Sequence, residues 1–173
     1  MARPPDIIAR HLDVLFCGIN PGMGSAAAGH NFVGRSNRFW KIVHLAGFTP
    51  SQILPQEDHL LLDYGCGVTS VVDRPTAGAA ELSRVEFQDA AQAFNEKIAR
   101  YAPRIVAFLG KAGYVGMTGQ RDIGWGKQPV GLHGADVWVL PNPSGRNRAF
   151  SLDRLVEAYR SLHLARHALD QKS

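Results

Sequence analysis

Short apolar runs alternate with longer amphipathic segments along the chain. The runs are rich in β-branched and aromatic residues, which favour strands, and they cover Val14–Cys17, Val68–Val72, Arg104–Leu109 and Val137–Leu140. Strands that alternate with helical segments are typical of a sheet with helices on both faces. The pattern therefore predicts an α/β fold, a three-layer sandwich in which a short, largely parallel central sheet is flanked by helices.

Helix-capping residues stand at the start of three of the amphipathic segments. Ser36 precedes an apolar stripe and is predicted to cap its helix. Ser83 and Glu86 have the spacing of a capping box ahead of a strong helical stripe, and Ser151 opens a last helix. The segment Gly113–Gly134 is rich in glycine and fits neither a helical nor a strand pattern.

Composition places the chain among ordinary globular proteins. Its 173 residues with 45% hydrophobic content are enough for one domain, residues 1–173, with a core that needs no metal or disulfide. No apolar run approaches the roughly 20 residues that span a bilayer, and the start of the chain lacks a secretory hydrophobic region. We therefore expect a soluble, cytoplasmic monomer with no membrane contact.

Neither cysteine chemistry nor charge points strongly to a function. Cys17 lies in an apolar run and Cys66 lies between two glycines, so there is no CxxC pair and no zinc spacing. Two thiols cannot hold an iron–sulfur cluster, which needs about four. The net charge of +4 is compatible with a polyanionic partner and equally with an ordinary solvated surface.

Two Asn-Pro loops follow apolar runs and are the best candidates for a site. Asn20 lies in the loop after the first run and Asn142 lies in the loop after the last. Ligands of open α/β sheets bind beyond the carboxyl ends of the strands, so both loops are predicted to border one site. The alternative is that each is a plain turn, for which Asn, Pro and Gly are usual residues. Neither loop carries a nucleotide-binding glycine motif, which disfavours a Rossmann-type metabolic enzyme.

Seven motifs occur in order between about Val14 and Tyr159. They are Gly18-Ile19-Asn20-Pro21-Gly22, Asn31-Phe32, Asn37-Arg38-Phe39-Trp40, Gly67-Val68-Thr69 with Arg74-Pro75-Thr76, Leu109-Gly110-Lys111, Trp125-Gly126-Lys127-Gln128 and Pro141-Asn142-Pro143-Ser144-Gly145. Together they resemble the motifs of the mismatch-specific uracil/thymine-DNA glycosylases, a branch of the uracil-DNA glycosylase superfamily. The resemblance implies an enzyme that flips a base out of DNA and cuts its N-glycosidic bond without metal or cofactor.

By this resemblance Asn20 holds the attacking water. An amide carbonyl can orient water without being ionised, whereas the fastest uracil enzymes have an Asp at this position that also stabilises the developing cation. Asp73 is a second catalytic candidate, because a carboxylate at a strand end could orient water or stabilise positive charge on the sugar. The alternatives for Asp73 are an ion pair with Arg74 or a loop cap.

The resemblance also implies a pocket for the flipped base. Phe32 matches the aromatic that stacks on the base, and its backbone N–H and that of Ile19 match donors to the base oxygens. Ser25 matches a residue near the pyrimidine 5-methyl, where thymine would be partly disfavoured relative to uracil. The neutral amide of Asn142 would support the leaving base. The implied pocket residues are Ile19, Gly22, Ser25, Phe32 and Asn142.

The resemblance also implies a DNA-contacting loop at the end of the last motif and just after it, formed by Ser144, Gly145, Arg146, Asn147 and Arg148. Relatives often have an aliphatic wedge where this chain has Arg146, and an Arg can still stack on bases while its donors reach a guanine or a phosphate. His30 and His133 fall on no catalytic family position, and we expect surface or packing roles for both.

The resemblance thus implies a monofunctional glycosylase of base-excision repair. It would act on double-stranded DNA that contains uracil, best in G:U mismatches, with ethenocytosine and thymine as weaker substrates. It would associate with the nucleoid when bound to DNA. The alternative from another class is a non-catalytic module that binds damaged DNA with the same pocket.

Overall fold

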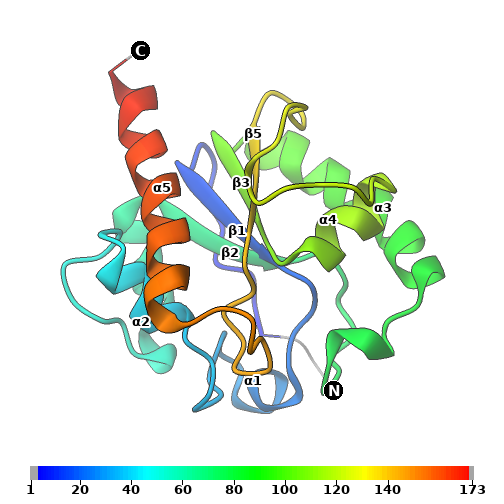
Figure 1. Ribbon diagram of the computed structural model, residues 1–173. Coiled ribbons are helices and arrows are strands. Elements are labelled where there is room, and N and C mark those ends of the chain that lie inside the picture. The colour runs from blue at the N-terminus through cyan, green and yellow to red at the C-terminus, as the bar shows by residue number, and fades with distance from the viewer. Residues whose placement is uncertain (1–3, 172–173) are drawn as a thin grey trace.

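The computed structural model describes residues 4–171 (Figure 1). The predicted domain also includes residues 1–3 and 172–173, which lie outside the described residues. The elements in chain order are β1 (Val14–Gly18), α1 (Met23–Ala28), α2 (Phe39–Leu45), the 3₁₀ segment η1 (Pro55–Tyr64), β2 (Cys66–Ser70), the 3₁₀ turn η2 (Ala79–Glu81), α3 (Arg84–Tyr101), β3 (Ile105–Leu109), α4 (Lys111–Thr118), β4 (Gly126–Lys127), β5 (Asp136–Leu140) and α5 (Leu152–Asp170).

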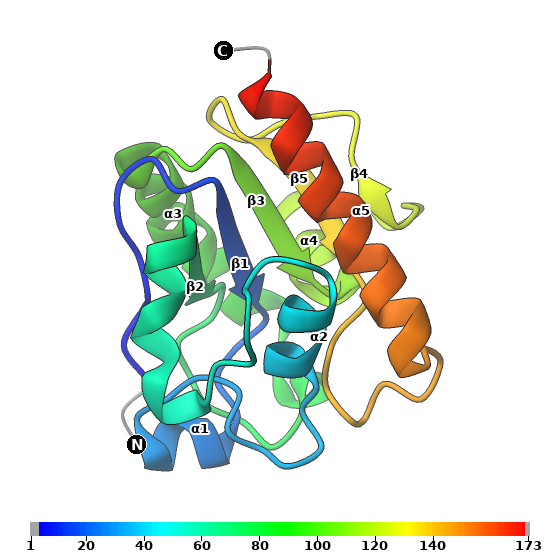
Figure 2. The same ribbon diagram turned by 90° about the vertical axis from the view of Figure 1, so that its left-hand side faces the viewer.

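A five-stranded sheet in the order β2-β1-β3-β5-β4 forms the centre. Strands β2, β1, β3 and β5 are parallel to one another. Among the strands of the described residues, only the two-residue β4 pairs antiparallel, with β5. Helices α2 and α5 cover one face of the sheet and α3 and α4 cover the other (Figures 1 and 2). This confirms the predicted α/β fold with helices flanking a largely parallel sheet.

The two faces are built by alternation along each strand. In β1, Val14 and Phe16 pack against α2 and α5, whereas Leu15 and Cys17 pack against α3 and α4. All four side chains are at most 1% exposed, as expected for a central parallel strand that is covered on both faces. The functional consequence is that β1 holds the loop after Gly18 on a rigid base.

The two cysteines are free and buried. Burial raises the pKa of the Cys17 thiol, and it raises the pKa of the Cys66 thiol to about 12. Both sulfurs are therefore protonated and unreactive at neutral pH, and they serve as packing groups.

The capping predictions have a mixed outcome. Ser83 forms a full capping box with Glu86, and the Ser151 hydroxyl accepts the N–H of Arg154 at the start of α5. The prediction that Ser36 caps a helix is wrong, because α2 begins at Phe39 and the Asn37 Oδ1 accepts the first helical N–H. Ser36 lies instead against the loop that follows β5, where it has a different packing role.

Candidate active site

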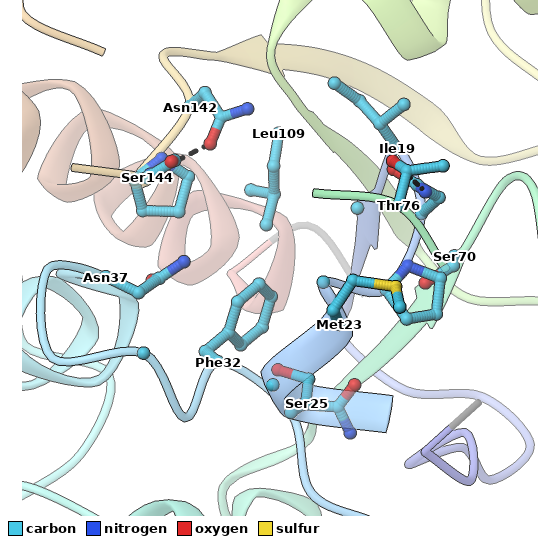
Figure 3. A pocket seen from close by; sticks show the side chains of 18 of the residues that line it. Ile19, Met23, Ser25, Phe32, Asn37, Ser70, Thr76, Leu109, Asn142 and Ser144 are labelled. Atoms are coloured by element: carbon cyan, nitrogen blue, oxygen red, sulfur yellow. Dashed lines mark hydrogen bonds between the residues drawn. The ribbon is translucent and has the colours of Figure 1, made fainter. Parts of the chain in front are cut away.

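A cavity of about 370 Å³ opens at the carboxyl ends of β1, β2, β3 and β5 (Figure 3). The loop after β1 and the start of α1 form one side, and the loop after β5 forms the opposite side. Asn20 and Asn142 both line this cavity, so the two Asn-Pro loops share one rim as the strand order requires. Among the lining residues within 4–171, Arg146 is the only one with a charged side chain, so the chemistry available there rests on amides, hydroxyls and backbone groups.

Both amide hydrogens of Asn20 are engaged by the protein. The Nδ2 donates to the Arg74 carbonyl at 2.7 Å and to the Thr76 hydroxyl at 2.8 Å. The Thr76 hydroxyl itself donates to the Gly78 carbonyl at 2.8 Å, so it can only accept from Asn20. This assigns the amide orientation: the Oδ1 has no hydrogen bond within residues 4–171 and remains an acceptor for a ligand.

Asn142 has the opposite orientation. Its Oδ1 accepts the Ser144 N–H at 2.9 Å, which closes a short turn, and Figure 3 shows its Nδ2 directed away from Ser144. Gly110, at φ +102°, lies beside this amide, and the Cβ it lacks would lie 3.5 Å from the Nδ2. Within residues 4–171 the Nδ2 donates to no protein group. Asn142 therefore presents a donor where Asn20 presents an acceptor.

Phe32 forms an aromatic wall of the cavity. Its ring stacks on Phe39 with centroids 4.1 Å apart and planes inclined by 23°, and it projects into the cavity in Figure 3. The backbone is left-handed with φ +55°, which costs about 1–3 kcal/mol for a residue of this size. Phe32 and Ile19 both line the cavity, and within residues 4–171 their backbone N–H groups donate to no protein group.

Gly22 and Ser25 form the α1 side of the cavity. Gly22 is the N-cap of α1 and pairs with Thr76 in an isolated bridge. This bridge connects the loop after β1 to the segment after β2, whose groups accept the Asn20 hydrogen bonds. The Ser25 hydroxyl accepts the Val33 N–H at 3.4 Å, and within residues 4–171 it donates its own hydrogen to no protein group.

Arg38 organises the loop after β5, a role that the sequence did not indicate. Its guanidinium donates to the carbonyls of Pro143, Ser144, Asn147 and Phe150 over 2.9–3.4 Å. The buried Tyr159 hydroxyl donates to the Pro141 carbonyl at 2.8 Å, and burial raises the pKa of this phenol, so it stays a neutral donor. The only sequence signal was the position of Arg38 inside a motif.

The residues of the predicted DNA-contacting loop divide into an inner and an outer set. Ser144 lines the cavity, Gly145 packs so closely on Ser36 that a Cβ would lie 2.4 Å from the Ser36 Cβ, and the Asn147 amide donates to the Asn142 carbonyl. Arg146 and Arg148 are exposed. Arg146 also lines the cavity, and its guanidinium lies beside Gly78; within residues 4–171 no carboxylate pairs with it.

Asp73 lies outside this arrangement. It is exposed and does not line the cavity, although it follows β2 and precedes the Asn20 partners Arg74 and Thr76. The Arg74 side chain pairs with Glu86, and this ion pair lowers the pKa of the Glu86 carboxyl to about 2.

His30 and His133, for which surface or packing roles are expected, also lie outside the cavity lining. His30 contacts Asp58 through its Nδ1, and the exposed His133 contacts Asn95 at 3.0 Å. Residues 4–171 contain no group of three or more His, Cys, Asp or Glu side chains arranged to hold a metal ion. No helix in the same range is long and apolar enough to cross a bilayer.

A family profile described as "Uracil DNA glycosylase superfamily" matches residues 5–163. The chain belongs to the uracil DNA glycosylase superfamily. Membership indicates a DNA glycosylase, a hydrolase whose partner is DNA. A solution NMR structure of a candidate uracil DNA glycosylase from Methanosarcina acetivorans is similar in fold, with a TM-score of 0.62 and 21% sequence identity, over 92% of this chain and 96% of that chain.

Proposed function

We propose that the protein is a monofunctional, mismatch-specific uracil-DNA glycosylase. It hydrolyses the N-glycosidic bond of uracil, best opposite guanine, and takes ethenocytosine and thymine as weaker substrates. The observation that carries this proposal is the opposed orientation of two neutral amides across one cavity: Asn20 offers an acceptor and Asn142 offers a donor.

The reaction needs a positioned water and a stabilised leaving group. The Asn20 Oδ1 accepts a hydrogen bond from a water that attacks C1′ of the deoxyribose as the bond from C1′ to N1 of uracil breaks. The electron pair of that bond leaves with the base, so negative charge develops on the uracil oxygens. Three donors are suited to stabilise this negative charge by hydrogen bonds: the N–H groups of Ile19 and Phe32 and the Asn142 Nδ2. Such donors lower the barrier most when they lie where charge develops in the transition state.

No residue in this scheme acts as a general base. Asn20 cannot take the proton of the water, so the proton passes to solvent and the uracil anion is protonated after release. The enzyme is therefore slower than one with a carboxylate at this position and depends more on a good leaving group. Any contribution of the exposed Asp73 is made from outside the cavity lining, through its charge or an intervening water.

The Ser25 position sets the preference for uracil over thymine. Ser25 lines the cavity where the 5-substituent of the stacked pyrimidine would lie, by the family resemblance. A single methyl group changes transition-state binding by only about 1–3 kcal/mol, so thymine is disfavoured without being fully rejected.

Single-turnover excision on end-labelled duplexes tests the proposal. Substrates with G:U, A:U, G:T and G:ethenocytosine pairs are incubated with excess enzyme, and abasic sites are then revealed with alkali. We expect the highest rate on G:U and no strand cleavage before alkali. Abasic sites on none of the substrates, with binding to the damaged duplexes retained, would instead identify a non-catalytic module.

A further inference from the structure

We propose that Asp58 is a positioning residue for base recognition, because it holds Phe32 in its left-handed conformation. This inference rests on the proposed function, in which Phe32 stacks on the flipped base. Asp58 lies in η1, is 6% exposed, and does not itself line the cavity.

The Asp58 carboxylate is bound by the two residues that precede Phe32. Its Oδ2 accepts the backbone N–H of Asn31 at 3.0 Å and the Asn31 side-chain amide at 3.2 Å. Its Oδ1 contacts the His30 Nδ1 at 3.4 Å. A buried carboxylate needs such partners, and here they come from one short stretch of a loop 27 residues away in sequence.

The next peptide group, between Asn31 and Phe32, is held as well. The Trp40 indole donates to the Asn31 carbonyl at 3.1 Å. This carbonyl and the Phe32 N–H belong to one planar trans peptide and point in opposite directions, so the bond to Trp40 fixes the direction of the Phe32 N–H. We call the set His30, Asn31, Trp40 and Asp58 the Phe32 latch.

A latch is required because the conformation is unfavourable by itself. Positive φ at a bulky residue persists only where surrounding contacts over-determine it. With the latch intact, the ring of Phe32 and its N–H are set before a base arrives. Without the latch, residue 32 relaxes toward negative φ. Part of the free energy of base binding is then used to restore the pocket, and the base binds more weakly.

Asp58→Asn tests the latch with little change in shape. The amide that replaces the carboxylate carries no charge and has one acceptor oxygen in place of two, which weakens the bonds to Asn31 and alters the contact with His30. The control is Asp63→Asn in the same η1 segment, because Asp63 is exposed and contacts neither His30 nor Asn31. Melting temperatures are recorded for both variants to establish that each is folded at the assay temperature.

Three readouts separate positioning from a general loss of structure. Asp58→Asn is expected to lower the single-turnover rate on G:U about tenfold and to weaken binding to a duplex with non-hydrolysable 2′-fluoro-2′-deoxyuridine opposite guanine by a similar factor. Affinity for a duplex with a tetrahydrofuran abasic site, which has no base to stack, should stay within about twofold of wild type. Asp63→Asn should match wild type in all three.

A double-mutant cycle with Phe32→Leu completes the test. If Asp58 acts through Phe32, adding Asp58→Asn to Phe32→Leu should cost much less than it costs alone. Equal losses in both backgrounds, equal weakening on the abasic duplex, or no effect of Asp58→Asn on the 2′-fluoro duplex would overturn the inference. A wild-type protein that binds the 2′-fluoro duplex but never excises uracil would contradict the proposed function alone, and the binding ratios would still decide the role of Asp58.

Discussion

The loops after β1 and β5 share an Asn-Pro pair but hold their amides in opposite ways. Asn20 donates both Nδ2 hydrogens to the segment after β2, and its side-chain carbonyl is available to a ligand. Asn142 accepts the Ser144 N–H with its side-chain carbonyl, and its Nδ2 is available to a ligand. In the proposed mechanism the two loops therefore serve the two ends of the reaction, the attacking water and the departing base. The difference between the two amides comes from the neighbouring groups rather than from the side chain itself.

The largest expected effect is on the water side of this comparison. Asn20→Ala should lower single-turnover excision of uracil by on the order of 10³-fold, because the acceptor that orients the water is lost. Affinity for the uracil duplex should remain nearly unchanged, since Asn20 does not hold the base. Excision comparable to wild type would remove this mechanism.

Asn20→Asp provides a sharper version of the same experiment. A carboxylate would direct an oxygen at the Arg74 carbonyl, where the Nδ2 now donates. The substitution should therefore fail to produce a fast enzyme and should lower the melting temperature. A rate above wild type would show that the surroundings of Asn20 tolerate charge and that its amide orientation is not important.

Removal of the donor on the base side should have the second largest effect. Asn142→Ala is expected to slow excision of uracil by about 10²-fold, the scale found when one donor to a developing anion is removed. Affinity for an abasic duplex should be retained, because that ligand has no base for the Nδ2 to contact. Equal weakening on the abasic duplex would indicate that Asn142 mainly shapes its own loop.

Arg146 tests whether the loop after β5 also fills the gap left by the flipped base. Arg146→Ala should reduce duplex excision about tenfold through the loss of volume and charge, with a much smaller effect on single-stranded uracil DNA, where no gap needs filling. Arg146→Leu should retain activity on G:U. Equal losses on the two substrates for Arg146→Ala, or none on either, would show that Arg146 is not a wedge.

Salt dependence of DNA binding separates the charge of Arg146 from its volume. Each neutralised phosphate contributes about 0.9 to the slope of log affinity against log salt. Arg146→Leu should therefore lower the slope by up to about one such increment if the guanidinium contacts a phosphate. A flat dependence for the wild-type protein between low and physiological salt would count against DNA as its partner.

The smallest expected effect belongs to Asp73. Asp73→Asn should slow excision by no more than a few-fold, because an exposed carboxylate outside the cavity acts on the sugar through solvent that screens its charge. The melting temperature is recorded on the same preparation. A lower melting temperature with an unchanged rate per folded molecule would assign Asp73 a structural role.

The sequence alone could predict the fold and the position of the site. Alternating apolar runs identified the sheet, and the strand-end rule placed both Asn-Pro loops on one rim. The orientation of Asn142 could also have been inferred, because its bond to Ser144 spans two residues and is a common local turn.

The orientation of Asn20 could not be inferred in the same way. Its partners lie 54 and 56 residues away, and no local pattern records that contact. Ser36 was misread for a related reason, since its capping signal is local whereas its actual neighbour is Gly145. Asp58 left no signal at all, because an acidic residue beside Glu57 and His59 is typical of a solvated surface.

The division between a water side and a base side is tested most directly by changing the leaving group. Excision of uracil and of 5-fluorouracil, each opposite guanine, is measured under single turnover for wild type, Asn20→Ala and Asn142→Ala. Fluorine stabilises the departing anion, so the fold reduction in excision rate caused by Asn142→Ala should be about tenfold smaller on 5-fluorouracil than on uracil. The fold reduction caused by Asn20→Ala should be the same on both bases. Identical losses on the two bases for Asn142→Ala, or a loss for Asn20→Ala that shrinks in parallel, would contradict the division.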